Sequence, residues 1–150
     1  MNKLARYQRI ADQLEELFQK TDNFNARMAT TCALLHHKFN YYFWTGFYSL
    51  IDGQLTVQTY QGPVACLVLK KRLGVCWASI NEKKSIIVSD VEKFPGHIAC
   101  DSRSKSEIVI PLIKNNEVLA VLDIDSKELN SFDDEDREGL EIIIKLLLEG

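Results

Sequence analysis

The feature that most limits the fold of this chain is a change of hydrophobic period at Tyr42. Before this residue, apolar side chains recur at the three- and four-residue spacing of a helix, and after it aromatic and β-branched residues dominate. Residues 43–50 and 55–60 form two strand-like runs separated by Asp52-Gly53, a dipeptide typical of a tight hairpin turn. The sequence therefore predicts a β-hairpin directly after a helical N-terminal region.

A second hairpin is predicted near the other end of the chain, where residues 108–113 and 118–125 are joined through Asn115-Asn116. Helical patterns flank the two hairpins, at residues 4–18, 24–39 and 132–147. Hairpins and helices that are segregated in this way favour an α+β fold, with an antiparallel sheet and the terminal helices packed on one face.

The segment between the hairpins is expected to cross over the other face of the sheet. It contains a predicted third strand at residues 64–69, a short helix at 74–83 and a brief strand at 85–88. A polar, turn-rich loop at residues 94–107 follows, with Cys100 at its centre. Long loops of this kind are usually binding loops or lids. We therefore expect a ligand to lie between the sheet and this excursion, and Cys100 to be the residue that the loop presents.

Composition excludes several classes of protein. The 150 residues, 46% hydrophobic and 26% charged, fit a single globular domain spanning 1–150. The net charge of −3 and the shortness of the one basic cluster, Lys70-Lys71-Arg72, argue against a nucleic-acid partner. No apolar run approaches the ~18 residues of a membrane span, and the N-terminus reads as an amphipathic helix rather than a signal peptide. We expect a cytoplasmic protein with no membrane partner.

Thiols stay reduced in the cytoplasm, so the four cysteines indicate packing, metal or redox chemistry before a permanent disulfide framework. Cys32 lies among small residues within a predicted helix and is interpreted as packing. Cys66, Cys76 and Cys100 all lie in or beside the excursion, ten and then twenty-four residues apart. The absence of any Cys-x-x-Cys pair gives little support for a zinc site, although His97-x-x-Cys100 leaves a metal site open as an alternative.

A reactive cysteine at position 100 needs a positive local potential, because the thiolate is the reactive form. His97 and Arg103 lie three residues to either side of Cys100 and would provide it, whereas the adjacent Asp101 opposes it. The sequence alone does not decide between these influences.

Asp123 and Asp125 lie two residues apart on a predicted strand and therefore face the same side. Two like charges beside apolar neighbours are destabilising unless a cation lies between them or one of them holds a proton. They are candidates for binding an ammonium group or for supplying a proton, and a solvated strand end is the structural alternative.

Glu107 directly precedes the apolar run at residues 108–110, and its orientation depends on the second hairpin. A three-residue turn pairs Glu107 with Asp125, whereas a two-residue turn pairs it with Ile124 and turns it away. We predict either the longer turn or a bulge near Pro111.

Trp44 and Tyr48 are four residues apart on one strand and share a face. They form either the wall of a ligand pocket or ordinary core.

At these residues the sequence resembles the free methionine-(R)-sulfoxide reductases, which are stand-alone members of the GAF-domain fold. The resemblance covers essentially the whole chain and includes three cysteines at matched spacing. The stretches that carry it are Phe43-Trp44-Thr45-Gly46-Phe47-Tyr48, Gln61-Gly62-Pro63-Val64-Ala65-Cys66, Gly74-Val75-Cys76, Gly96-His97-Ile98-Ala99-Cys100-Asp101, Ser106-Glu107-Ile108-Val109 and Val121-Leu122-Asp123-Ile124-Asp125-Ser126. The chain departs from the family between Leu69 and Trp77, where a segment rich in Pro and Gly is usual.

The resemblance implies a fold, a substrate and a reaction. The fold is a GAF-like antiparallel sheet with N- and C-terminal helices on one face and a ligand-covering excursion on the other. Free L-methionine-(R)-S-oxide is the implied substrate, held by polar groups at its amino-acid end and by aromatic side chains such as Trp44 and Tyr48 at its methyl end.

In the implied reaction, the Cys100 thiolate attacks the sulfoxide sulfur while an acid protonates the departing oxygen. That acid is Glu107, Asp123 or Asp125. The sulfenic acid formed on Cys100 then condenses with a second thiol, with Cys66 as first choice and Cys76 as second. Thioredoxin is the implied reductant of the disulfide, a homodimer the implied assembly, and no metal or organic cofactor is implied.

Two other functions remain open. One is a non-catalytic GAF module that senses a small ligand, against which the lack of an attached output domain argues. The other is a thiol switch that responds to peroxide through the same cysteines.

Overall fold

The computed structural model describes residues 2–97 and 100–149. Ile98 and Ala99, which belong to the predicted loop at residues 94–107, lie outside the described residues. The helices are α1 (Lys3–Leu17), α2 (Phe24–Lys38), α3 (Gly74–Glu82) and α4 (Asp134–Leu148), with short 3-10 turns η1 (Phe18–Lys20) and η2 (Val91–Lys93). The strands are β1 (Trp44–Ile51), β2 (Gln54–Gln61), β3 (Val68–Leu69), β4 (Ile86–Val88), β5 (Ser106–Lys114) and β6 (Glu117–Ser126).

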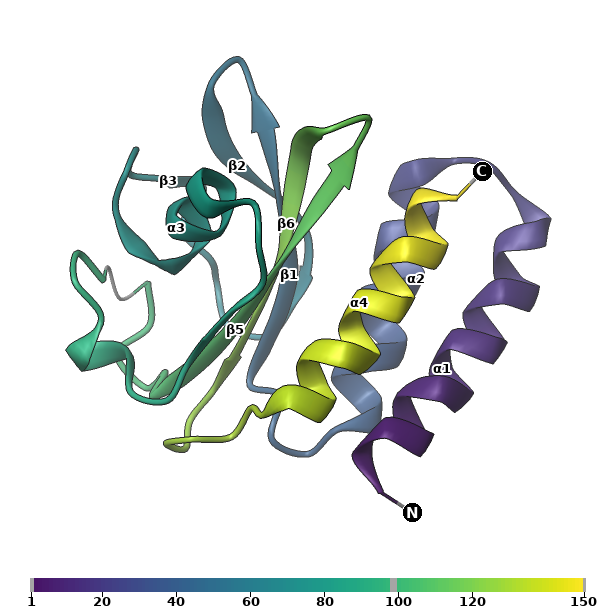
Figure 1. Ribbon diagram of the computed structural model, residues 1–150, viewed down its shortest axis with the longest axis horizontal. Helices are drawn as coiled ribbons and strands as arrows, with labels where there is room; N and C mark the ends of the chain where they lie inside the picture. The colour runs from purple at the N-terminus through teal and green to yellow at the C-terminus, as the bar shows by residue number, and fades with distance from the viewer. Residues whose placement is uncertain (1, 98–99, 150) are drawn as a thin grey trace.

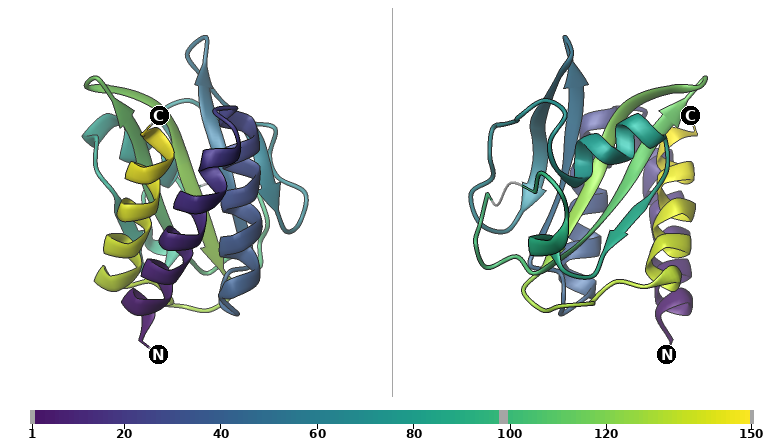
Figure 2. Two further views of the ribbon diagram at one scale, coloured as in Figure 1. Left: turned by 90° about the vertical axis from the view of Figure 1, so that its right-hand side faces the viewer. Right: turned by 60° about the vertical axis from the view of Figure 1, so that its left-hand side comes forward.

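The six strands form one antiparallel sheet in the order β3-β2-β1-β6-β5-β4. Figure 1 shows α1, α2 and α4 on one side of this sheet, and α3 with the long excursion on the other. The helices α2 and α4 lie next to the sheet, and α1 packs over them on the side away from the sheet (Figure 2). The predicted α+β architecture, with terminal helices on one face and the excursion on the other, is confirmed. Among the described residues, no helix has the length and apolar character needed to cross a membrane.

The sheet is buried on both faces, so the apolar side chains form two cores. The larger core lies between the sheet and the three long helices and includes Tyr7, Leu14, Phe47 and Leu122. The smaller core lies between the sheet and the excursion. Within the described residues it contains Trp44, Tyr48, Leu55, Ala65, Val75, Cys76, Trp77, Val88, Val91, Val109 and Val121.

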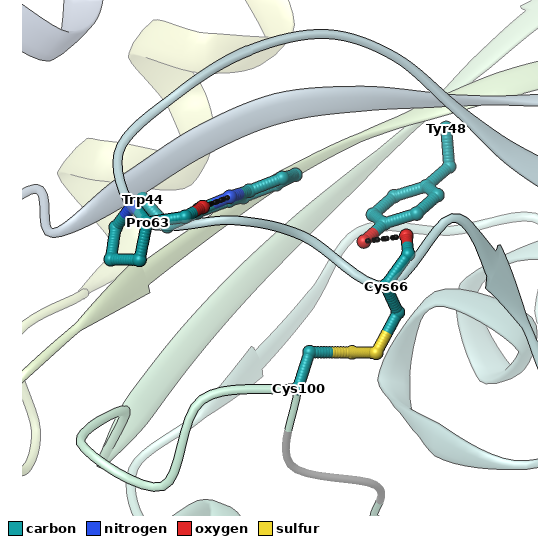
Figure 3. Close-up of a disulfide and its surroundings, with 5 residues drawn as sticks. All are labelled: Trp44, Tyr48, Pro63, Cys66 and Cys100. Carbon is teal, nitrogen blue, oxygen red and sulfur yellow. Dashed lines mark hydrogen bonds between the residues drawn. A yellow bond between two sulfur atoms is a disulfide. The ribbon is translucent and has the colours of Figure 1, made fainter.

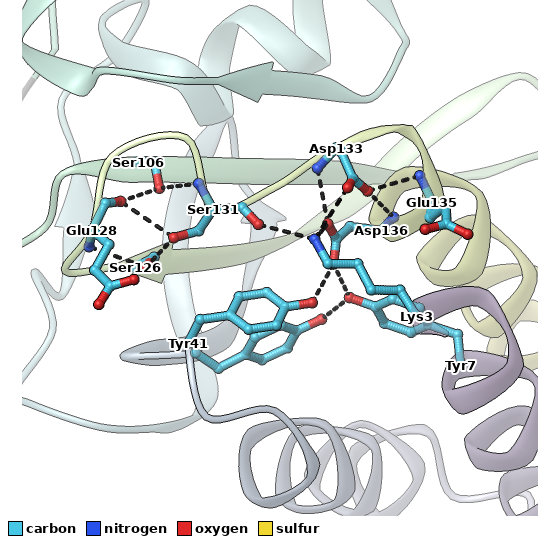
Figure 4. A network of polar contacts seen from close by, with 11 residues as sticks. Lys3, Tyr7, Tyr41, Ser106, Ser126, Glu128, Ser131, Asp133, Glu135 and Asp136 are labelled. Carbon is cyan, nitrogen blue, oxygen red and sulfur yellow. Dashed lines mark hydrogen bonds and ion pairs between the residues drawn. The ribbon is translucent and has the colours of Figure 1, made fainter. Parts of the chain in front are cut away.

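The N-termini of α1 and α4 are joined by a buried polar network around Asp136. The Asp136 carboxylate accepts hydrogen bonds from the hydroxyls of Tyr7 at 2.6 Å and Tyr41 at 2.5 Å, and it forms a 2.7 Å ion pair with Lys3 (Figure 4). Asp133 and Asp136 also form a capping box that satisfies backbone N–H groups at the start of α4. These contacts fix the terminal helices to each other and hence to the sheet.

Both predicted hairpin turns are present, and each has two residues with positive φ. These are Asp52 and Gly53 (50° and 77°) in the first hairpin, and Asn115 and Asn116 (54° and 64°) in the second. Two left-handed residues are the requirement of a type I′ turn, which matches the twist of an antiparallel pair. Asp52-Gly53 and Asn115-Asn116 therefore identified the two hairpins correctly from the sequence.

One β-bulge decides the register of the second hairpin. Lys114 pairs with Glu117 across the two-residue turn, but the register shifts between Leu112 and Ile113, so that Leu119 is an extra residue on β6. Beyond this bulge Glu107 pairs with Asp125. The bulge predicted near Pro111 is confirmed.

The predicted strand at residues 64–69 is wrong for most of its length, because only Val68 and Leu69 pair with β2. Leu67 still accepts a backbone hydrogen bond from the Val57 N–H of β2 at 2.9 Å, but the backbone before Leu67 is held by side chains. The indole N–H of Trp44 donates to the carbonyl of Pro63 at 3.1 Å, and the Tyr48 hydroxyl donates to the carbonyl of Cys66 at 3.3 Å. Residues 62–67 therefore cross the face of the sheet as irregular chain.

Candidate active site

A pocket lies between the sheet and the excursion, where the sequence predicted a ligand. Its walls come from β1, β5, β6, the start of α3 and the loops before and after it. Seven of the eight sequence-predicted site residues line it: Trp44, Tyr48, Cys76, Cys100, Glu107, Asp123 and Asp125. The eighth, Cys66, is bonded to Cys100 at the edge of this pocket.

Cys66 and Cys100 form a disulfide although 34 residues separate them, and their Cα atoms are 5.5 Å apart. Figure 3 shows the bond joining the irregular segment before β3 to the loop after η2. The Tyr48 hydroxyl holds the Cys66 carbonyl from the sheet side. The sequence left Cys66 and Cys76 open as partners of Cys100, and in the structure Cys100 is bonded to Cys66. The part each cysteine takes in a reaction stays a prediction.

Cys76 and Cys32 are free and buried. Burial, followed by the charges of Asp123, Glu107 and Asp125, raises the pKa of the Cys76 thiol well above its ordinary value. Cys32 lies in the other core, where burial raises its pKa to about 12, and its sulfur contacts the Thr59 carbonyl. Both thiols are therefore protonated at neutral pH and are poor nucleophiles.

The charges around Cys100 largely cancel. Arg103 donates to the Asp101 carboxylate through two guanidinium nitrogens at 2.9 and 2.7 Å, and these bonds lower the pKa of Asp101 to about 2. The same guanidinium lies 4.9 Å above the ring of Phe43, at the start of the first hairpin. Burial lowers the pKa of His97, so its imidazole is neutral at neutral pH. Neither cation that the sequence offered beside Cys100 supplies an uncompensated positive charge.

Three carboxyl groups share the floor of the pocket. Glu107 and Asp123 are each only 6% exposed, and Asp125 is half-buried. The strand register places Glu107 opposite Asp125 and Asp123 opposite Val109, so all three project from the same face of β5 and β6. A solvated strand end is therefore excluded for this cluster.

Burial is the main reason that the pKa of Glu107 is raised well above its ordinary value, with the charges of Asp123 and Asp125 adding to it. Burial and the charge of Asp123 raise the pKa of Asp125 in the same way, and burial raises that of Asp123. One oxygen of Asp123, Oδ1, has no hydrogen-bond partner within the described part of the chain. An acidic pocket with an unfilled buried acceptor is suited to a cationic hydrogen-bond donor such as an ammonium group.

The same cluster has the donor atoms for a metal ion. Cys76, Glu107 and Asp123 each offer one atom, and these atoms lie within 4.8 Å of one another. One thiolate and two carboxylates suit zinc with an open fourth position. The metal alternative that the sequence raised at His97 and Cys100 gains no support, because the Cys100 sulfur is bonded to Cys66.

Aromatic side chains form one wall of the pocket. The ring of Trp44 stacks on that of Tyr48 at 5.7 Å and on that of Tyr60 at 5.3 Å. A side chain at Gly46 would collide with both Trp44 and Tyr60, so glycine is required there for the stack to form. Trp44 and Tyr48 thus belong both to the core and to the pocket wall. Their shared face on the strand could not show which of these two roles they have.

Sequence reasoning did not identify every residue of the pocket. Val64, Leu73 and Ser104 also line it. Val64 and Leu73 lie in segments that the sequence assigned to a strand and to the turn before a helix, so no spacing pattern marked them. Ser104 lies in the loop that contains Cys100, and its position in that polar run was the one signal available.

Together, the six-stranded antiparallel sheet, the helices on one face and the ligand pocket under a crossover excursion define the GAF class of small domains. The chain belongs to the GAF domain family, whose sequence profile matches residues 27–147, and it is closely similar over its full length to free methionine-R-sulfoxide reductases. The resemblance seen in the sequence is thereby confirmed.

Three relatives illustrate this similarity. The free methionine-R-sulfoxide reductase of Escherichia coli is 38% identical over 98% of this chain and 89% of its own length. The GAF domain-containing protein A of Dictyostelium discoideum is 47% identical over 97% of this chain and 92% of its own. The structure of the free methionine-R-sulfoxide reductase of Neisseria meningitidis, in complex with its substrate, superposes with a TM-score of 0.93 at 36% identity, covering 98% of this chain and 89% of that one.

Proposed function

We propose that this protein is a thiol-dependent oxidoreductase that reduces free L-methionine-(R)-S-oxide to L-methionine. The observation that carries the proposal is the Cys66–Cys100 disulfide at the edge of a buried pocket with three carboxyl groups. A disulfide in this position is the expected product of a reaction in which a thiol takes an oxygen atom from a bound sulfoxide. Full-length similarity to proteins of that activity supports the substrate.

The pocket offers complementary groups for both ends of this substrate. Glu107, Asp123 and Asp125 provide acceptors for the ammonium group, including the unfilled Oδ1 of Asp123. The stacked rings of Trp44 and Tyr48 provide an apolar wall for the methyl-sulfinyl end. A free amino acid, rather than a residue within a protein, is favoured because a peptide bond removes the ammonium charge.

The proposed reaction transfers the sulfoxide oxygen to Cys100. The Cys100 thiolate attacks the sulfoxide sulfur and a carboxylic acid donates a proton to the sulfoxide oxygen, so that a bond forms between the two sulfurs. The hydroxyl then transfers from the methionine sulfur to the Cys100 sulfur while the bond between the sulfurs breaks, which releases methionine and leaves a sulfenic acid on Cys100. Burial raises the pKa values of Glu107 and Asp125, which favours retention of a proton in the cluster, and such a proton supplies that acid. Cys66 then attacks the sulfenic acid, water departs, and the disulfide forms.

Cys66 is preferred over Cys76 as the thiol that forms this disulfide. It is already bonded to Cys100, whereas the Cys76 thiol is buried and its raised pKa keeps it protonated. The cycle closes when a dithiol reductant, which we propose to be thioredoxin, supplies two electrons and two protons to regenerate the two thiols. A cytoplasmic location and a homodimeric assembly belong to the same proposal.

The test is a coupled assay with free methionine sulfoxide, thioredoxin, thioredoxin reductase and NADPH. Wild-type protein is expected to oxidise NADPH with one methionine formed per NADPH, to use the R epimer, and to lose all turnover as Cys100→Ser. Cys32→Ser is the matched control, because this cysteine lies in the other core.

Other results would favour the competing functions. Binding of methionine sulfoxide without turnover would contradict the reductase and favour a sensing module. Formation of the Cys66–Cys100 disulfide with peroxide but not with methionine sulfoxide would favour a peroxide switch.

A further inference from the structure

The most exposed large apolar side chains of the described residues flank the disulfide. Val64 is 82% exposed and Leu67 is 74% exposed, and they lie two residues before and one residue after Cys66. Single exposed apolar side chains are common on protein surfaces and need no explanation. Two exposed apolar side chains on either side of one redox cysteine indicate an interaction site, because clustered apolar surface is typical of such sites.

The apolar surface continues beyond these two residues. Val68 is 46% exposed and Leu73 is 38% exposed. Val64 and Leu73 also line the pocket together with Cys100, which places them at its mouth. Leu73 lies beside the loop that contains Cys100, since a Cβ added at Gly96 would come within 3.2 Å of its Cδ2 atom. We call Val64, Leu67, Val68 and Leu73 the Cys66 patch.

A basic turn borders the Cys66 patch. Lys70, Lys71 and Arg72 connect β3 to the segment before α3, and all three are exposed. No ion pair found in residues 2–97 and 100–149 involves any of them. The chain as a whole has a net charge of −3, so this is a local positive edge on an acidic protein. Such an edge favours a partner that carries acidic residues at the matching position.

We propose that the Cys66 patch and its basic edge are the docking surface for a dithiol reductant protein whose reactive thiol is surrounded by apolar side chains and bordered by acidic ones. The proposal rests on the proposed function, because that function requires the disulfide to be reduced in every cycle. A protein whose thiolate reaches the Cys66 sulfur must cover the side chains on either side of it. Apolar exposure at those positions, with charge beside it, is the surface that such a partner would bury.

On this surface the partner's two thiols would reduce the Cys66–Cys100 disulfide by thiol–disulfide exchange. The partner's thiolate attacks the Cys66 sulfur, the Cys66–Cys100 bond breaks, and Cys100 leaves as a thiolate. The partner's second thiol then attacks the mixed disulfide and releases Cys66. The partner is oxidised to a disulfide by two electrons, and this chain is reduced to two thiols.

The experiment measures reduction of the oxidised protein directly, without methionine sulfoxide, so that it does not depend on the proposed substrate. Oxidised protein is mixed either with dithiothreitol or with thioredoxin, thioredoxin reductase and NADPH, and the appearance of free thiols is followed. The variants are Leu67→Glu and the pair Lys70→Glu with Lys71→Glu. The control is Ile142→Glu, an apolar side chain with 38% exposure on α4, across the sheet from the pocket.

With thioredoxin, Leu67→Glu and the double charge reversal are each expected to lower the second-order rate constant for reduction at least tenfold. With dithiothreitol, which needs no docking surface, both should stay within twofold of wild type, and Ile142→Glu should match wild type with either reductant. Added salt should slow reduction of wild type by thioredoxin more than that of the charge-reversed variant.

Three results would overturn the proposal. The first is an unchanged rate with thioredoxin in both variants. The second is an equal loss with both reductants, which would assign the patch to folding or to the disulfide itself. The third is conversion of an oligomer to a monomer by Leu67→Glu without any change in reduction, which would assign the patch to a second copy of this chain. A wild-type protein that thioredoxin reduces but that does not turn over methionine sulfoxide would refute the proposed function and leave this surface standing.

Discussion

Glu107 lies directly opposite Asp125 in the β5–β6 ladder because one extra residue, Leu119, shifts the register by one position. Without that bulge the two-residue turn would pair Glu107 with Ile124 and point its carboxyl group into the helical core. The bulge is therefore what assembles three carboxyl groups in one pocket.

We expect Glu107→Gln to lower kcat/KM for methionine sulfoxide by about 10²- to 10⁴-fold, the range typical of a lost general acid. The amide keeps the shape of the side chain but removes the proton it can donate. Steady-state kinetics from pH 5 to 9 measure this. If Glu107→Gln retains wild-type kcat while Asp125→Asn loses it, Asp125 is the acid.

The carboxyl cluster also predicts how stability depends on pH. Burial, followed for Glu107 and Asp125 by neighbouring charge, raises the folded-state pKa values of Glu107, Asp123 and Asp125 above those of the unfolded chain. Folding therefore takes up protons, and the cluster's contribution to the free energy of unfolding falls as pH rises from about 4 through the folded values. Urea unfolding of ligand-free protein should show a smaller loss between pH 5 and 8 in Glu107→Gln than in wild type. A steeper loss in the variant would contradict the buried cluster.

Cys66→Ser and Cys76→Ser should separate the two remaining pocket cysteines. Cys66→Ser is expected to form one methionine per site and then to stop with thioredoxin, because the sulfenic acid on Cys100 has no thiol to condense with. Cys76→Ser should keep turnover within several-fold of wild type. Quenched-flow product analysis and sulfenic-acid trapping provide the measurement, and the reverse pattern would make Cys76 the condensing thiol.

Arg103 is expected to protect the reactivity of Cys100 by neutralising the residue beside it. In Arg103→Ala the Asp101 carboxylate loses its bidentate partner. The unpaired negative charge should raise the pKa of the Cys100 thiol and slow its alkylation by iodoacetamide at pH 7 in reduced protein. The double variant Asp101→Asn with Arg103→Ala should restore the rate. No recovery would show that Arg103 acts through its contact with Phe43 instead.

Gly139→Ala tests two opposing effects within α4. Helix propensity alone favours alanine by about 1 kcal/mol. A Cβ at this position, however, would collide with the buried ring of Tyr7 on α1. Overpacking of this kind costs about 1–3 kcal/mol, so we expect a net loss in the free energy of unfolding, measured by urea titration. A gain in stability would mean that α1 can move away at little cost.

The sequence predicted those parts of the fold that depend on local chemistry. Asp52-Gly53 and Asn115-Asn116 marked the hairpins, because the left-handed conformation in these turns restricts the residue type. Residues 64–67 were predicted wrongly as strand. Val64 and Ala65 line the pocket and Leu67 is exposed, and apart from one backbone hydrogen bond from Val57 to Leu67 the backbone is held by Trp44 and Tyr48.

The site was predictable as a set of residues but not as an arrangement. Spacing could not choose between Cys66 and Cys76 as the partner of Cys100, because the choice depends on how two loops cross. Nor could it show that Arg103 forms an ion pair with Asp101, which compensates the positive charge of the guanidinium. Such pairings are tertiary, and no local period encodes them.

The carbonyl groups of Pro63 and Cys66 accept hydrogen bonds from Trp44 and Tyr48, whose rings form the pocket wall. Two hydrogen bonds of this kind contribute roughly 1–3 kcal/mol together, so once the disulfide is reduced the backbone before Leu67 is attached to the sheet only weakly. A bound molecule that displaces the Trp44 indole or the Tyr48 phenol would break a hydrogen bond that holds the segment containing Cys66. Occupancy of the pocket and the reach of Cys66 are therefore coupled through the same two side chains.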